Sequence, residues 1–453
     1  MHPCLQNGSI RELAQALRSQ SLTPIDLAAH VDRRIDVLKP TNAHLHFDPV
    51  TLLSNLVQLG SHPSASPLHS IPVSVKDLMD VQGLPTTCGA HRDSPSPFIK
   101  NRAPQDAAWL SHWRQAGACL VSKTHLNEHA YGITGENPWF GDCTLPWDPT
   151  RLSGGSSSGA AVSVAGGAAW IGLGTDTGGS LRVPAALCGL TSLRAPGWFP
   201  NHTGIAPLAP SFDALGWIQR HLDEVGIVAR ALPGIPIEPD ASPVPPTLLW
   251  IEGALPESCE SAILRTRAEL HLLLIRAGWR ISHQSRAGWD DALSLFAPLQ
   301  AAEAWDIHRS SCLAQPQTFS EPVRQRLEAG SRMTPADRSQ LLLDRRRFTQ
   351  RTAEWLRPGT VAVLPATPMT HLGAGADQGP NRPRLLALTT PASLCNLPVL
   401  TVPIAHPSDS FPCGFQFITA QGGEWLLVQL ADHLAKVLPP VSIPAITRNA
   451  FPR

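Results

Sequence analysis

The sequence is most informative between residues 154 and 180, which read GGSSSGAAVSVAGGAAWIGLGTDTGGS. Glycine, serine, alanine and threonine dominate this stretch, and Asp176 is its only charged residue. The stretch is too apolar for a flexible linker, and side chains this small let one backbone segment approach another closely. We therefore expect a tightly packed segment in which backbone lies against backbone.

Short apolar runs and amphipathic stretches alternate on both sides of this segment. Ser9 with Glu12, and Thr23 before Pro24, are typical helix starts. An alternation of strands and helices predicts an α/β fold with a largely covered sheet. The Pro-rich residues 233–246 predict an exposed connection. The expected strands are 71–75, 118–121, 248–251, 279–281, 361–364 and 399–402, and the expected helices are 9–17, 23–38, 258–277 and 334–356.

The composition of the chain limits its partners. Its 453 residues are 43% hydrophobic, and 36 basic residues balance 36 acidic ones. Without a general basic field we expect neither a nucleic-acid nor an anionic-membrane partner. The nine cysteines are odd in number and form no C-x-x-C pair, which favours free thiols in a reducing cytoplasm. The N-terminus lacks the pattern of a signal peptide, and residues 160–174 are too short to span a bilayer.

Three segments together carry a specific resemblance: IPVSVKD at 71–77, GGSSSG at 154–159 and GTDTGGSLRVPA at 174–185. In this order they closely resemble the amidase-signature family, and weaker similarity extends over almost the whole chain. The resemblance implies a mixed, twisted central sheet covered by helices on both faces. It also implies a single domain over residues 1–453, with a helical segment at about 1–65, the signature core at about 66–225, a βαβ and helical insertion at about 234–357, and a C-terminal return to the core at about 358–453.

The family's catalytic residues can be transferred to matching positions of this chain. Ser180 corresponds to the nucleophile, Ser156 to the relay serine that follows a cis peptide bond, and Lys76 to the base. A serine hydroxyl attacks an amide only after a base removes its proton, and a lysine serves only if burial lowers its pKa. The end of an apolar strand, where Lys76 lies, fits that need. The implied oxyanion hole consists of the backbone amides of Thr177, Gly178, Gly179 and Ser180.

The resemblance also implies supporting and substrate-binding residues. Asp176 and Arg182 would hold the nucleophile loop by hydrogen bonds, with Ser157 beside the relay serine. One departure from the family pattern is Ser158, which stands where glycine is usual. The resemblance places a substrate loop at Tyr131, Gly132, Ile133 and Thr134, although a packing role for Tyr131 fits the sequence equally well.

Three other patterns compete with this interpretation. Residues 155–159 fit the G-x-S-x-G elbow with Ser157 as nucleophile, but that elbow follows a strand, and 148–153 does not resemble one. Residues 125–129 fit the zinc pattern H-x-x-E-H, which places two histidines one helical turn apart. Lys123 is a second lysine at a strand end, for which we expect a structural role.

We therefore expect a hydrolase that cleaves the carbon–nitrogen bond of a small amide or ureide and releases ammonia or an amine. No metal or organic cofactor is implied. The motifs resemble carboxybiuret hydrolases and the A-type component of glutamyl-tRNA amidotransferase, so a glutaminase component working with partner proteins is one alternative. A non-catalytic scaffold of the same fold is another. For protein partners, a homodimer and a small companion protein remain open.

Overall fold

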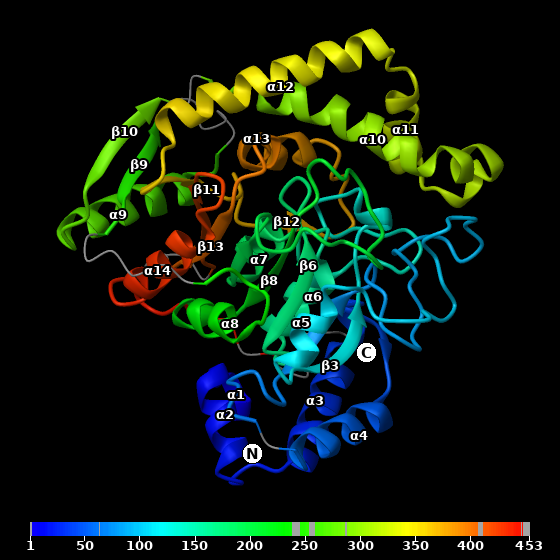
Figure 1. Cartoon of the computed structure of the whole chain (residues 1–453), viewed down its shortest axis with the longest axis vertical. Helices are drawn as coiled ribbons and strands as arrows, with labels where there is room; N and C mark the ends of the chain where they lie inside the picture. The colour runs from blue at the N-terminus through cyan, green and yellow to red at the C-terminus, as the bar shows by residue number, and fades with distance from the viewer. Residues whose placement is uncertain are drawn as a thin grey trace.

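The computed structural model describes residues 2–62, 64–237, 245–252, 259–285, 288–405, 411–444 and 446. Its centre is an eleven-stranded mixed sheet flanked by helices, which confirms the α/β expectation (Figure 1). The strand order across the sheet is β1 (His44–Phe47), β3 (Cys119–Thr124), β2 (Pro72–Lys76), β6 (Ile171–Thr175), β8 (Leu215–Gln219), β7 (Thr191–Arg194), β13 (Val399–Ile404), β14 (Cys413–Thr419), β11 (Thr360–Pro365), β9 (Thr247–Glu252) and β10 (Ile281–Ser285).

The pairing of β2 with β6 positions the candidate site. The two strands run parallel, with Val75 opposite Leu173. Their carboxyl ends, at Lys76 and Thr175, therefore lie at the same edge of the sheet. Both strands are buried along their whole length, as the apolar run before Lys76 predicts. The expected close packing of backbone is also found, since a Cβ on Gly172 would lie 2.6 Å from the carbonyl oxygen of Ala160.

Helices surround this sheet, and two layers of them are prominent at opposite ends of Figure 1. The N-terminal helices begin where the sequence predicts, since Ser9 with Glu12 and Thr23 with Asp26 each form a capping box. The helices in this half are α1 (Cys4–Asn7), α2 (Ile10–Arg18), α3 (Pro24–Leu38), α4 (Pro49–Gly60), α5 (Leu110–Gln115), α6 (Ser158–Ala165), α7 (Arg182–Cys188) and α8 (Val225–Ala231).

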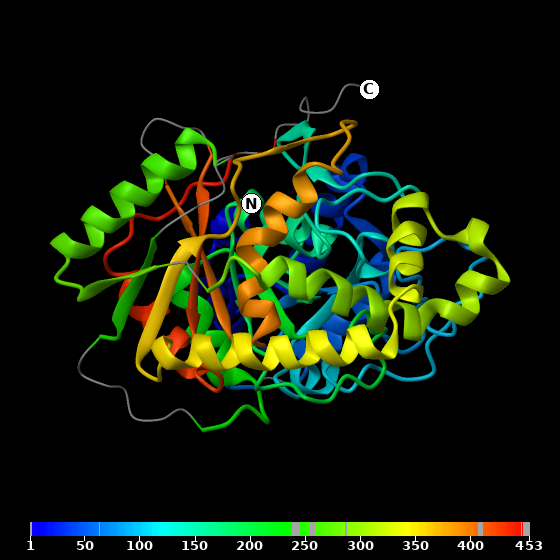
Figure 2. The ribbon, with the colours of Figure 1, turned by 90° about the horizontal axis from the view of Figure 1, so that it is seen from above.

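The C-terminal half adds long helices along one side of the molecule (Figure 2). The predicted βαβ unit is confirmed. In chain order α9 (Ser261–Arg276) lies between β9 and β10, and these two strands pair in parallel. Residues 253–258, where the predicted helix begins, and 238–244 of the Pro-rich connection lie outside the described residues. The other helices are α10 (Ala292–Ala314), α11 (Glu321–Ser331), α12 (Pro335–Trp355), α13 (Asn381–Leu394) and α14 (Glu424–Leu434).

One prediction about local structure is wrong. Residues Asp148–Leu152 form strand β5, the middle strand of a small sheet between β4 (Thr144–Leu145) and β12 (Leu372–Gly373). Pro149 and the polar residues around it disfavour a strand locally, but antiparallel pairing with these two partners overrides that preference.

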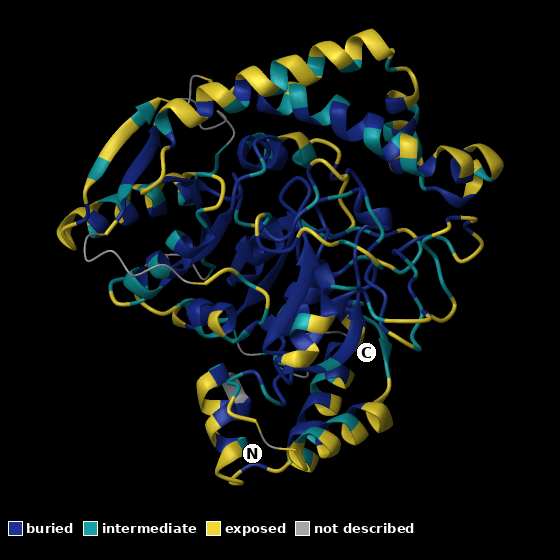
Figure 3. Cartoon of the chain, viewed as in Figure 1, coloured by how far each residue is buried: buried dark blue, intermediate teal, exposed yellow. Residues whose placement is uncertain are grey.

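Burial separates the core from the periphery (Figure 3). The central strands and α6, α7 and α13 are largely buried, whereas α12 and the N-terminal helices expose one side to solvent. No helix within the described part of the chain is long and apolar enough to cross a membrane.

Candidate active site

Lys76 is enclosed by the protein, and its amine contacts two hydroxyl groups. The Nζ atom lies 2.7 Å from Ser156 Oγ and 2.9 Å from Thr175 Oγ1, and the side chain has no solvent exposure. Burial lowers the pKa of Lys76 to about 7, although the more distant carboxylates of Asp176 and Asp213 act to raise it. Near neutral pH much of this lysine is therefore uncharged and able to accept a proton.

Ser156 lies in the loop between β5 and α6, and the peptide bond that precedes it is cis. The Gly155 N–H donates to the Ile133 carbonyl at 2.9 Å, which ties this loop to the segment expected to bind substrate. The neighbouring hydroxyls also have partners: Ser157 Oγ lies 3.2 Å from the Thr175 carbonyl oxygen, and Ser158 Oγ lies 3.1 Å from His125 Nδ1.

Ser180 ends the loop between β6 and α7 and is 4% exposed. The two serine loops are joined by their backbones, because the Ser157 N–H donates to the Ser180 carbonyl at 3.1 Å. In the described residues the hydroxyls of Ser156 and Ser180 do not form a direct hydrogen bond. The structure therefore brings Lys76 into contact with Ser156 and places Ser180 on the adjoining loop.

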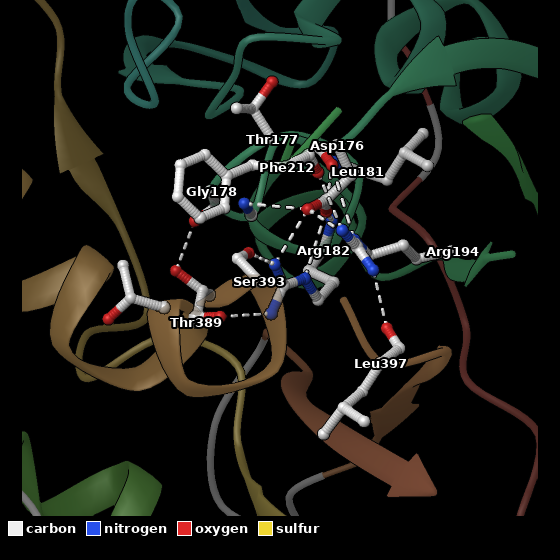
Figure 4. A network of polar contacts seen from close by, with 12 residues as sticks. Asp176, Thr177, Gly178, Leu181, Arg182, Arg194, Phe212, Thr389, Ser393 and Leu397 are labelled. Carbon is white, nitrogen blue, oxygen red and sulfur yellow. Dashed lines mark hydrogen bonds and ion pairs between the residues drawn. The ribbon is translucent and has the colours of Figure 1, made fainter. Parts of the chain in front are cut away.

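Asp176 organises the loop that carries Ser180 (Figure 4). Its carboxylate accepts the N–H of Gly179 at 2.9 Å and that of Leu181 at 3.0 Å. It also accepts two bonds from the Arg182 guanidinium, at 2.8 and 3.0 Å. Burial alone would raise the pKa of Asp176, but Arg182 and Arg194 outweigh it and hold this pKa well below its usual range. The loop is thus fixed around a buried, ionised carboxylate.

This network engages one of the four amides expected in the oxyanion hole. The Gly179 N–H is directed at Asp176, so it is already engaged. Within the described part of the chain the amides of Thr177, Gly178 and Ser180 have no acceptor, so three of the four expected donors are unengaged. Gly179 has φ +127°, and a Cβ there would lie 2.9 Å from the Thr389 side chain, so both conformation and space require glycine.

The predicted substrate loop borders a cavity of about 550 Å³. Tyr131, Gly132, Ile133 and Thr134 all contribute to its wall, together with residues of α11 and α13. The Tyr131 side chain is only 2% exposed, and the Arg326 guanidinium lies 5.5 Å from the centre of its ring. Both expected roles of Tyr131 thus fit the structure, since it is packed and also lines a cavity.

The H-x-x-E-H and G-x-S-x-G patterns do not adopt the geometries that a zinc site and a nucleophile elbow require, and Lys123 is engaged in an ion pair. His125 and His129 do not share a helical face, because the only helix in residues 125–129 is the 3₁₀ turn Glu128–Ala130, in which His129 has φ +49°. Both ring nitrogens of His125 have partners, Gly141 O at 2.8 Å and Ser158 Oγ. A strand does precede Ser157, contrary to our expectation, but it belongs to the small sheet and ends at Leu152. Lys123 forms a fully buried ion pair with Asp77 at 2.5 Å.

The residues described above lie within a region that matches a known protein family. A family model described as Amidase matches residues 27–428. The chain belongs to this family. A solved structure described as "Crystal structure of amidase" has a TM-score of 0.87 and 29% sequence identity, over 95% of this chain and 100% of that one.

Two curated relatives match this amidase-family protein over different lengths of chain. "Putative amidase AmiD" of Mycobacterium tuberculosis is 26% identical over 453 residues, or 94% of each chain. A glutamyl-tRNA(Gln) amidotransferase component from Legionella pneumophila is 31% identical over 234 residues, or 51% of this chain and 47% of the relative. The match thus spans about half the length of the second relative.

Sequence reasoning missed several residues that hold this site in the amidase-family chain. Thr175, the second hydroxyl beside Lys76, directly precedes Asp176 in the motif and could have been found from that adjacency. The others come from distant segments and carry no local signal. Arg194 donates to the Phe212 carbonyl at 2.9 Å, Thr389 donates to the Gly178 carbonyl at 2.5 Å, and Gln416 accepts from Arg182 at 2.8 Å.

Proposed function

We propose that this amidase-family protein hydrolyses the carbon–nitrogen bond of a small amide or ureide through an acyl-enzyme on Ser180. The observation that carries the proposal is the buried contact of 2.7 Å between Lys76 Nζ and Ser156 Oγ, with the lysine pKa at about 7. Family membership and the full-length amidase relatives support the same reaction class.

In the first half of the proposed reaction, the Ser180 oxygen forms a bond to the carbonyl carbon of the substrate. Ser156 takes the proton of Ser180 and gives its own proton to the neutral amine of Lys76, which becomes an ammonium. The carbonyl oxygen gains the negative charge. The amides of Thr177, Gly178 and Ser180 donate to that oxygen, an interaction that is strongest in the transition state.

The second half restores the enzyme. As the carbon–nitrogen bond breaks, the proton returns from Lys76 through Ser156 to the departing nitrogen, which leaves as ammonia or an amine. Water then attacks the Ser180 ester by the same route and releases the carboxylic acid. Because Lys76 has a pKa near 7, it can both accept and return the proton at neutral pH.

A screen for ammonia and amine release tests the proposal. Purified protein is incubated with small amides, ureides and glutamine, in parallel with the S180A variant. We expect release from at least one small amide or ureide by the wild-type protein and only background release by S180A. Equal release by both proteins contradicts the assignment of Ser180. Release from glutamine alone would favour a role as the glutaminase component of an amidotransferase, the class to which the Legionella relative belongs.

A further inference from the structure

The peptide unit between Thr177 and Gly178 has no hydrogen bond with any residue that the structure describes. The peptide units on either side of it are held. The Asp176 carbonyl accepts from the Ala214 N–H at 3.2 Å. The Gly178 carbonyl accepts from the Thr389 hydroxyl at 2.5 Å. The orientation of the middle unit, which carries the free Gly178 amide, therefore depends on how the Thr177 side chain is fixed.

A carboxylate holds that side chain. The Thr177 hydroxyl donates to Asp213 Oδ1 at 2.5 Å, and the threonine is buried. The other carboxylate oxygen of Asp213 accepts the amides of Leu208 at 2.9 Å and Ala209 at 3.1 Å. In Figure 4 the Thr177 side chain points away from Arg182, so its contact with Asp213 lies outside the buried arginine network.

The turn that carries Asp213 is held in place by two long helices. Glu303 on α10 accepts the amide of Ser211 at 2.9 Å, and Arg345 on α12 donates to the Ser211 carbonyl at 2.9 Å. The Arg345 guanidinium also lies 4.1 Å from the centre of the Phe212 ring. The Asp213 carboxylate is thus a fixed point against which the loop of Thr177 can be ordered.

We propose that Asp213 is a positioning residue whose carboxylate holds Thr177, so that the amides of Thr177 and Gly178 face the carbonyl oxygen of the substrate. These two amides belong to the two peptide planes that meet at the Thr177 Cα, so fixing this residue restricts both donors. Alignment matters because a misplacement of about 1 Å can cost about 100-fold in rate. The inference rests on the proposed function, because it assumes that the acyl group is transferred to Ser180.

The charge of Asp213 gives the inference a second readout. Burial lowers the pKa of Lys76, and the carboxylates of Asp176 and Asp213 act in the opposite direction. Asp176 contacts Arg182 and Arg194 directly. The hydrogen-bond partners of Asp213 in the described residues are instead a hydroxyl and two amides. D213N removes the charge and keeps the shape of the side chain, so the pH below which kcat/KM falls should move to a lower value.

Three threonine variants test the hydroxyl separately from the charge. T177V keeps the volume of the side chain and removes its hydroxyl, so we expect kcat to fall by about 10- to 100-fold. T177S keeps the hydroxyl, and its kcat should be at least about fivefold above that of T177V. T51V is the matched control and should retain the wild-type kcat. Thr51 Oγ1 donates to Asp48 at the start of α4 at 2.5 Å, and the same carboxylate accepts two amides.

Three outcomes overturn the inference while leaving the amidase proposal intact: equal kcat in T177V and T51V, equal kcat in T177S and T177V, or an unmoved pH dependence in D213N. Hydrogen exchange of the peptide that covers residues 176–181 serves the case in which no amide is hydrolysed and the proposed function itself fails. Exchange there should be at least about 10-fold faster in T177V than in T51V, because the loop has lost its anchor. Equal exchange in the two variants contradicts the role of Asp213.

Discussion

Lys76 and Ser156 are 80 residues apart in the sequence, yet their Nζ and Oγ atoms lie 2.7 Å apart inside the protein. Only an uncharged amine can take a proton from that hydroxyl. Since burial lowers the pKa of Lys76 to about 7, the uncharged fraction increases as the pH rises through 7 and decreases below it. The contact therefore predicts how the rate depends on pH.

We expect kcat/KM to fall about tenfold for each pH unit below about 7, the pKa of Lys76 in the free enzyme. Initial rates from pH 5 to 9 measure this decrease, which we call the acid limb of the pH profile. The substrate is an uncharged amide, so that the substrate itself does not titrate in this range. A rate that stays constant down to pH 5 contradicts the assignment of Lys76 as the base.

Replacement of Thr175 by valine tests the second hydroxyl beside the amine. The Thr175 oxygen, 2.9 Å from Nζ, accepts a hydrogen bond from a charged ammonium and so favours the charged form. T175V should therefore move the acid limb to lower pH. T401V serves as the control, because the buried Thr401 hydroxyl on β13 has no partner in the described structure and its loss should leave the limb in place. A limb at the same pH in T175V contradicts this role.

Gly179→Ala tests the geometry of the oxyanion loop. A methyl group there would meet the Thr389 side chain at 2.9 Å and displace amides on either side, so we expect kcat to fall by about 100- to 1000-fold. Gly422→Ala is a matched control, since Gly422 also has positive φ but has nothing within 4 Å. G422A should cost some stability and retain activity. Comparable kcat values in the two variants would show that Gly179 does not order the oxyanion donors.

Arg182→Met tests the buried network around Asp176. The variant leaves a fully buried carboxylate without its main partner, so the free energy of unfolding should fall by about 3–5 kcal/mol. R92M removes an arginine whose side chain is 90% exposed and should change stability by less than about 0.5 kcal/mol. Denaturant titration measures both. A loss in R182M no larger than that in R92M contradicts the network's role.

The sequence predicts the parts of this site that are local. The strand before Lys76, the two serine loops and the loop at Tyr131–Thr134 each follow from a contiguous motif. Contacts between distant segments could not be predicted. Nothing in the sequence indicates that Thr389 binds the Gly178 carbonyl or that Gln416 accepts a hydrogen bond from Arg182. Strand β5 was missed in part for the same reason, because one of its two partners, β12, lies more than 200 residues away, while the other, β4, is adjacent in the sequence.

The side chain of Asp176 makes a contact that the motif alone does not predict. The resemblance assigns four amides to the oxyanion hole, but the structure directs the Gly179 N–H toward Asp176. Hydrogen-bond direction depends on the backbone turn, which residue types alone do not specify. The glycines of this loop thus have separate tasks: Gly178 leaves its amide free, and Gly179 supplies the turn.

The most direct measurement is mass-spectrometric mapping of the residue labelled by a fluorophosphonate. We expect one adduct per chain, on the peptide that contains Ser180, with labelling abolished in S180A, slowed in K76M and still directed to Ser180 in S157A. An adduct on Ser157, or equal labelling of the wild-type protein and S180A, would contradict it.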